Sequence, residues 1–304
     1  STSSRGLGDV YKRQDISRIF DKNGNYKFDG FSEFLTVYEN ATQALQSPED
    51  FKRLTQSVLE NLAENNVIYA EVFISPDFCG DRDLGAWREY LAAMREAHVE
   101  GVTLKGIVTC IRHFGPEKAR EAALCAVETA GDWVVGFGMA GAENFGRARD
   151  FSYSFDMARE AGLRLTSHAG EWCGAASVWE TLKELRVERI GHGVHSINDP
   201  KLVEHLAETG VALEINPGSN VALGVYPSWI DHPMKRLRDA GVKVTVSTDD
   251  PPFFGTTMTR EFEELESAYG WGIEDFKLLN ETALEVAFCD LATKDVIAKR
   301  LEAL

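Results

Sequence analysis

The sequence predicts an α/β fold, a (β/α)8 TIM barrel that lacks its first strand. From residue 50 onward, seven apolar runs rich in β-branched residues alternate with segments of helical periodicity. Several runs are nearly continuously apolar, as in parallel strands that are buried on both faces. No Pro- or Gly-rich linker divides the 304 residues, of which 44% are hydrophobic. A single barrel domain of this kind typically takes about 250 residues.

The strands are expected at residues 67–75, 104–111, 134–140, 163–167, 189–193, 212–216 and 242–248. Helices are expected between them. Residues 83–98 carry apolar side chains at helical spacing, and residues 199–209 begin with Asp199 at the cap and Pro200 at the first helical position. A glycine stands where three of the helices should end, at Gly162, Gly210 and Gly241.

The ends of the chain differ from its repeating middle. Residues 15–66 are expected to be mostly helical, and residues 257–304 to supply the closing helix and one more. Residues 1–14 show no periodicity and are rich in Ser, Gly and Arg, so we interpret them as a non-native leader and residues 15–304 as one domain. The alternative architecture, an open doubly wound sheet, usually has a Gly-rich turn after its first strand, and none follows residues 67–75.

Composition limits the partners. The formal net charge is −16, which disfavours binding to the phosphate backbone of a nucleic acid. Five cysteines lie far apart without a CxxC pair, as is typical of reduced thiols in a cytoplasmic protein. No apolar run approaches the roughly 20 residues of a membrane helix. We therefore expect a cytoplasmic protein with a small-molecule partner.

Three of the predicted strands end in side chains that can carry chemistry. His168 is followed by a turn that returns Glu171 to the same side, His192 lies between two glycines, and Asp249 and Asp250 follow the last strand. If that strand continued through both acids, they would point in opposite directions and have different roles. Each motif alone has a structural alternative: a core histidine, a surface glutamate or an acidic turn. Together, His nitrogen and carboxylate oxygen are ligands of catalytic zinc, which keeps one position for water.

These strings resemble the signature motifs of the adenosine deaminase family. The resemblance rests on residues 167–171 (SHAGE), 189–194 (RIGHGV) and 247–251 (STDDP), and residues 136–143 and 216–220 resemble two further motifs. It implies a (β/α)8 barrel with one zinc ion that hydrolyses adenosine, a small-molecule purine nucleoside, to inosine and ammonia. Residues 134–141 contain no Lys of the kind that bridges two metals in binuclear relatives.

The resemblance also implies a role for each residue. His168 and Asp249 are expected to bind Zn2+, and Glu171 to donate a proton to purine N1, which requires a raised pKa. His192 is expected to orient the zinc-bound water and help to deprotonate it. Asp250 is expected to contact N7, and the backbone N–H of Gly141 to face N3.

A second implied feature is a hydrophobic lid over the purine. It is expected on one helical face that holds Phe31, Phe34, Leu35 and Tyr38. An ordinary stripe that faces the core is an equally good interpretation of each of these residues.

One part of the family pattern is missing. The family's first strand carries an HxH motif with two more zinc ligands, and the printed sequence contains no HxH. We therefore expect this chain to bind zinc weakly and to deaminate poorly. Adenine deaminase is the near alternative, against which Gly191 and residues 220–224 weakly favour a nucleoside. A non-catalytic purine-binding barrel is the other, although it would not need Glu171 and His192.

Overall fold

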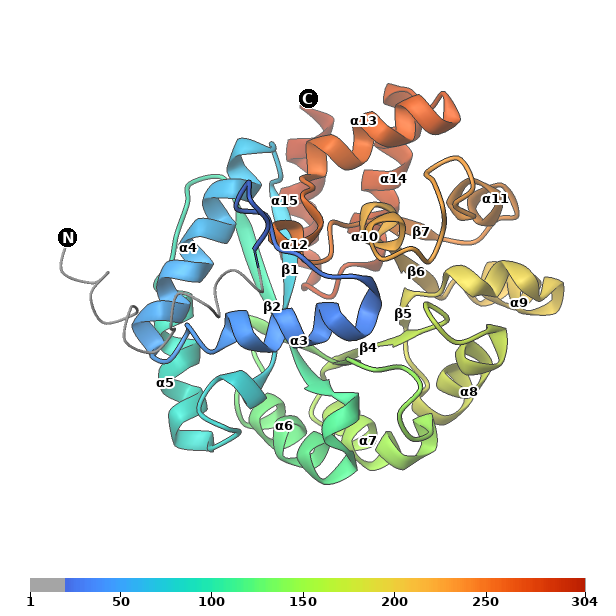
Figure 1. Ribbon diagram of the computed structural model, residues 1–304. Coiled ribbons are helices and arrows are strands. Elements are labelled where there is room, and N and C mark those ends of the chain that lie inside the picture. Colours follow the sequence, from blue (N-terminus) through green and yellow to red (C-terminus); the bar gives the residue numbers. More distant parts are fainter. Residues whose placement is uncertain (1–19, 304) are drawn as a thin grey trace.

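The computed structural model describes residues 20–303, so the predicted leader, residues 1–14, lies outside the described residues. Seven parallel strands form one sheet, in which each strand pairs with the next along the chain (Figure 1). The strands are β1 (Tyr69–Ile74), β2 (Thr103–Ile111), β3 (Val134–Ala140), β4 (Arg164–Ala169), β5 (Arg189–His192), β6 (Ala212–Ile215) and β7 (Val244–Val246). All seven predicted strands are confirmed, although the last is shorter than residues 242–248.

The sheet curls as the wall of a barrel does. The guanidinium of Arg189 on β5 lies 2.8 Å from the Glu71 carboxylate on β1, although three strands separate β1 from β5 in the sheet. Such a contact requires that the sheet bend back on itself. Within residues 20–303, β1 and β7 are the edges of the sheet, so the predicted barrel-type α/β fold is confirmed for the described part of the chain.

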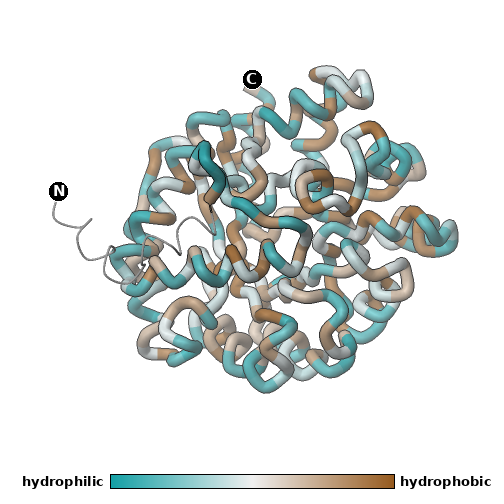
Figure 2. The backbone as a smooth tube through the Cα atoms, in the orientation of Figure 1, coloured by the Kyte–Doolittle hydropathy of each residue, from teal (hydrophilic) through white to brown (hydrophobic). Residues whose placement is uncertain are grey.

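Helices surround the sheet and present apolar faces to it (Figures 1 and 2). They are α4 (Pro48–Glu64), α5 (Leu84–Arg95), α6 (Pro116–Glu128), α7 (Ser152–Glu160), α8 (Ala175–Leu185), α9 (Pro200–Thr209), α11 (Met234–Asp239), α13 (Met258–Tyr269), α14 (Ile273–Val286) and α15 (Leu291–Glu302). The C-terminal segment thus forms three helices where two were predicted. Helix α9 begins as expected, because the Asp199 side chain accepts the N–H of Lys201 at 3.0 Å. None of the described helices is long and apolar enough to cross a bilayer.

Helix α3 (Gly30–Thr42) crosses in front of the strands in Figure 1. Its Phe34 ring lies 5.6 Å from Phe253 and 5.1 Å from Phe254, both on the short helix α12 (Pro251–Phe254) that follows β7. Phe31 lies 5.1 Å from Trp172 in the loop after β4. The apolar face of α3 therefore packs on loops that follow the carboxyl ends of the strands, which is where a lid would lie.

Candidate functional site

The side chains predicted to carry chemistry meet at the carboxyl ends of β4, β5 and β7. His168 on β4 and His192, the last residue of β5, have ring centroids 5.0 Å apart. His192 Nε2 lies 3.6 Å from Glu171 Oε2 and 3.7 Å from Asp249 Oδ2. Parallel strands bring their carboxyl ends to one edge of a sheet, and four of the predicted residues are therefore neighbours.

The backbone is unusual at two of these residues. His192 has φ 60° and Asp249 has φ 57°, in the left-handed region that non-glycine residues rarely adopt and that is enriched at functional sites. Strand β7 ends at Val246, so the expectation that Asp249 and Asp250 alternate along a strand is wrong. A left-handed residue instead turns the chain into α12, and Ser219 Oγ donates to Asp249 Oδ2 at 2.7 Å.

Two glycines leave room for histidine rings, one in the candidate site and one beside it. A Cβ at Gly191 would lie 2.6 Å from His168 Nδ1, so only glycine admits that ring. Gly141, which follows β3, has φ +100°, and a Cβ there would lie 2.7 Å from His113 Nδ1. The next residue, Ala142, donates its N–H to the same His113 nitrogen at 3.1 Å. Gly141 thus lies beside His113 and adjoins the site through the loop that leads to Glu143.

Glu143 holds the loop that carries Glu171. Its Oε2 accepts the backbone N–H groups of Glu171, Trp172 and Cys173 at 3.1, 2.8 and 3.1 Å, and Oε1 accepts the N–H of Gly170. The Ser177 hydroxyl donates to the same carboxylate at 2.7 Å. In the sequence, Glu143 is the last of residues 136–143, which resemble a family motif. Its role in holding this loop depends on hydrogen-bond donors that lie 27 to 34 residues further along the chain.

Burial sets the protonation of the site. Glu171 is only 5% exposed, and its pKa is raised well above the usual value by burial and then by the charges of Asp249, Glu143 and Asp250. This is the direction expected of an acid that donates a proton. Burial and the neighbouring Asp249 also raise the pKa of Asp250. Burial, and then His168, hold the pKa of His192 well below its usual value, so its imidazole is neutral at pH 7.

The side chains suited to a metal form only part of a zinc shell. His168 and Asp249 are of the types that zinc binds, but within residues 20–303 no three His, Cys, Asp or Glu side chains are grouped so as to hold a metal ion. A catalytic zinc ion needs about three protein ligands besides its water. The described residues therefore do not fit a complete zinc site.

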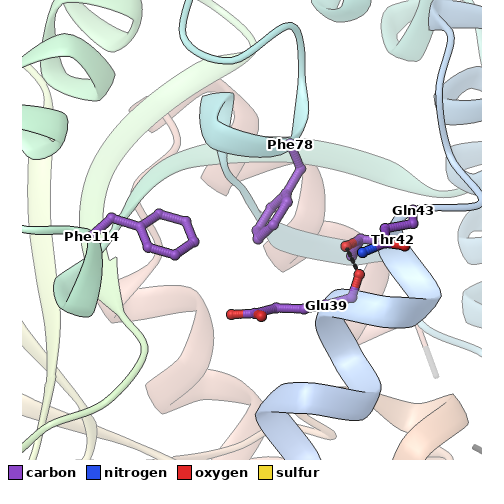
Figure 3. A pocket seen from close by; sticks show the side chains of 5 residues that line it. All are labelled: Glu39, Thr42, Gln43, Phe78 and Phe114. Atoms are coloured by element: carbon purple, nitrogen blue, oxygen red, sulfur yellow. Dashed lines mark hydrogen bonds between the residues drawn. The ribbon is translucent and has the colours of Figure 1, made fainter.

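A pocket of about 320 Å³ opens beside α3 (Figure 3). Its lining residues, on α3 and on the turns that follow β1 and β2, are Glu39, Thr42, Gln43, Phe78 and Phe114. Glu39 Oε1 lies 3.6 Å from His113 Nε2, which connects this pocket to Gly141. No lysine or arginine is among these lining residues, so the pocket has an acidic and aromatic wall.

Comparisons with known proteins agree with this arrangement. Residues 12–304 match the family model described as adenosine deaminase. A protein of Rhizobium rhizogenes named adenine deaminase is 45% identical over 300 residues, which cover 97% of this chain and 93% of the relative.

Solved structures show the same fold. The structure of an adenine deaminase from Arthrobacter aurescens aligns with TM-score 0.85 and 26% identity, covering 98% of this chain and 93% of the other. An amidohydrolase from Burkholderia ambifaria with bound Zn aligns with TM-score 0.83 and 25% identity, covering 99% and 87%. With a family model matched over nearly the whole chain and its motifs gathered at one edge of the sheet, this chain belongs to the adenosine deaminase family.

Proposed function

We propose that this protein is a purine aminohydrolase whose substrate is the free base adenine. Water replaces the 6-amino group, so that adenine and water give hypoxanthine and ammonia. The observation that carries the proposal is that Glu171, buried and with a raised pKa, lies with Asp249 beside the neutral His192. Glu171 Oε2 and Asp249 Oδ2 are 3.6 and 3.7 Å from His192 Nε2. A binding module would not need a proton donor held in so dry a site.

The chemistry follows from these protonation states. The Glu171 carboxyl donates its proton toward N1 of the purine, which draws electrons from C6 and opens that carbon to attack by water. His192 and Asp249 face the same space and orient the water. As the water oxygen bonds to C6, one of its protons passes to the 6-amino group; the C6–N bond then breaks, ammonia leaves, and the remaining hydroxyl proton returns to Glu171. A positioned acid of this kind typically contributes about 10²–10⁴-fold to the rate.

Adenine is better supported than adenosine. The relative at 45% identity and the Arthrobacter structure at 26% identity both carry the name adenine deaminase. The expectation of a nucleoside substrate came from the family resemblance, within which Gly191 and residues 220–224 weakly favoured a nucleoside over the free base. Gly191 has a different explanation in the structure, since it makes room for the His168 ring. The substrate specificity is therefore proposed to be that of the base.

A nucleotide substrate is disfavoured by charge. In the proposed pose the Gly141 N–H faces N3, so a substituent on N9 would extend toward the pocket of Figure 3. That pocket presents the Glu39 carboxylate and no basic side chain among its lining residues, and it would repel a phosphate group. The formal net charge of −16 acts in the same direction.

The test compares adenine, adenosine and AMP. Ammonia release and equilibrium binding are measured for each compound with the purified protein, with and without added Zn2+. We expect adenine to bind most tightly and to be the compound that is deaminated. Faster turnover of adenosine would contradict the proposed specificity, and tight binding of adenine with no turnover under any metal condition would support a purine-binding barrel instead.

A further inference from the structure

The two ring nitrogens of His192 have different surroundings: one faces the candidate site, and the other lies beside the side-chain amides of two asparagines. Nε2 faces Glu171 and Asp249, whereas Nδ1 lies 3.1 Å from Asn220 Nδ2 and 3.4 Å from Asn216 Nδ2. Asn216 Nδ2 also donates to the carbonyl oxygen of Glu214 at 3.1 Å, which identifies that atom as the amide nitrogen. One of the two neighbours of Nδ1 is thus a hydrogen-bond donor on independent grounds.

A second histidine orients the other amide. The backbone N–H of Met234 donates to His232 Nδ1 at 3.2 Å, so this nitrogen is an acceptor and the neutral His232 ring carries its proton on Nε2. His232 Nε2 lies 3.0 Å from Asn220 Oδ1. The Asn220 side chain therefore accepts from His232 with its oxygen and must turn its amino group toward His192 Nδ1.

All three side chains are buried, with exposures of 2% for His232, 0% for Asn220 and 1% for His192. Bulk water therefore does not compete for the atoms that join these three side chains, and buried polar groups of this kind are almost always hydrogen-bonded. The Tyr269 hydroxyl donates to the His232 carbonyl oxygen at 2.8 Å, which further fixes the segment that carries the second ring.

We propose that His232 is a positioning residue that, through Asn220, fixes the neutral tautomer of His192 with its proton on Nε2. Along this path the backbone N–H of Met234 fixes the tautomer of His232, and His232 in turn fixes the orientation of the Asn220 amide. The direction of the hydrogen bonds therefore does not rest on an assumption about which atom of that amide is oxygen and which is nitrogen. His232 does not contact the substrate in this account. It acts by determining which atom His192 presents to the site.

The tautomer changes the role expected of His192, and this consequence rests on the proposed function. With an N–H on Nε2, the ring donates a hydrogen bond into the space between Glu171 and Asp249. It can orient an attacking water and stabilise negative charge on its oxygen, but Nε2 has no lone pair with which to take the water's proton. Deprotonation by His192 is thus replaced by orientation, and the Asp249 carboxylate is the proton acceptor that remains in that space.

The experiment reads the tautomer directly. The 304-residue protein is labelled with 15N-histidine, and two-bond 1H–15N correlations distinguish a protonated from an unprotonated ring nitrogen. The chain has seven histidines, so His192→Gln assigns the signals by loss of one set. We expect the native His192 to show a protonated Nε2 and an unprotonated Nδ1. A proton on Nδ1 would overturn the proposal without any further variant.

Three substitutions at two positions test the path. In Asn220→Asp both carboxylate oxygens accept, so His192 should gain a proton on Nδ1. His232→Gln keeps a side-chain N–H donor and should preserve the native tautomer. In His232→Leu only the longer Asn216 contact, at 3.4 Å, still opposes a proton on Nδ1, so the other tautomer should become detectable. His98→Gln, on an exposed residue, is the control. A folded Asn220→Asp protein with an unchanged His192 tautomer would refute the proposal. Because no turnover is measured, this result stands even if the protein proves not to deaminate purines.

Discussion

At the scale of single residues, the site is organised by buried carboxyl groups in different protonation states. Glu143 accepts four backbone N–H groups and a hydroxyl, and these hydrogen bonds lower its pKa despite burial. For Glu171, on the loop that Glu143 holds, burial and negative neighbours outweigh a hydrogen bond with Trp172, and its pKa is raised. The same residue type thus anchors a loop in one position and, in the other, has the raised pKa that the proposed proton donor requires.

Glu261 supplies a prediction about pH. It is fully buried on α13, accepts the Gly218 N–H at 3.1 Å and the Thr256 hydroxyl at 2.7 Å, and burial raises its pKa from 4.5 to about 7. The folded protein therefore holds a proton that the unfolded chain releases above pH 4.5. Stability from this group is complete below pH 4.5 and is lost as pH rises to about 7.

We expect Glu261→Gln to remove this dependence. Relative to the native protein, the variant should gain up to about 3 kcal/mol in free energy of unfolding between pH 4.5 and pH 8, since each pKa unit corresponds to about 1.4 kcal/mol. Urea denaturation at several pH values measures the difference. The exposed Glu208→Gln is the control, and a gap between Glu261→Gln and native protein that stays constant with pH would contradict the assignment.

The candidate site residues could be located from the sequence because they lie at strand ends. His168, Glu171, His192 and Asp249 each follow an apolar run that could be identified in the sequence, and parallel strands bring such ends together. The partners of these residues could not be found in this way. His232 lies 12 residues from Asn220 in a loop with no periodic pattern, and its role exists only once Met234 fixes its tautomer.

At the scale of elements, α3 is held to the site by aromatic contacts. Phe34 is 6% exposed and lies within about 6 Å of rings on α12, which directly follows Asp250. The predicted stripe was open to two interpretations, lid or core, because helical spacing reports only that one face is apolar. The structure shows what that face covers: α12 and the loop after β4.

We expect Phe34→Ala to loosen α3 without unfolding the barrel. The substitution removes ring contacts worth about 0.5–1.5 kcal/mol each beyond the lost apolar burial, so local opening of α3 should become more frequent. Hydrogen exchange should be faster over residues 30–42 and unchanged over α5. Leu54→Ala, on an exposed side chain of α4, is the matched control. Unchanged exchange over α3, or a uniform increase across the chain, would contradict this account of the lid.

At the scale of the whole molecule, Arg189 joins distant parts of the curled sheet. It pairs with Glu71 on β1 at 2.8 Å and with Glu214 on β6 at 2.6 Å, and its guanidinium carbon lies 3.5 Å from the centroid of the Phe288 ring. The sequence predicted the seven strands by their apolar runs. It could not predict this ion pair, because the partners are 118 positions apart and meet only when the sheet bends.

We expect Arg189→Met to lower the free energy of unfolding by about 3–5 kcal/mol, because it leaves two buried carboxylates without a counter-charge. Arg88→Met is the matched control, since the Arg88–Glu128 pair at 2.9 Å is largely exposed and should contribute about 0–1 kcal/mol. Urea denaturation measures both. Equal losses in the two variants would show that Arg189 does not hold the sheet together.

Stable zinc binding requires the full set of protein ligands around the ion. The described chain offers His168 and Asp249 but no group of three ligands, so we expect the 304-residue protein to retain much less than one zinc ion per chain after dialysis. Elemental analysis of the dialysed protein measures this stoichiometry, with Asp249→Asn expected to lower it further. Retention of one zinc ion per chain would contradict the prediction.

The central claim is that the Glu171 carboxyl donates to purine N1, and a binding cycle tests it without depending on turnover or metal. Adenine and 1-deazaadenine, in which N1 is replaced by CH, are titrated into the native protein and into Glu171→Leu. We expect the native protein to bind adenine about 2- to 13-fold more tightly than 1-deazaadenine, since one hydrogen bond is worth about 0.5–1.5 kcal/mol, and Glu171→Leu to bind the two compounds equally. Equal affinities in the native protein, or a preference that persists in Glu171→Leu, would contradict it.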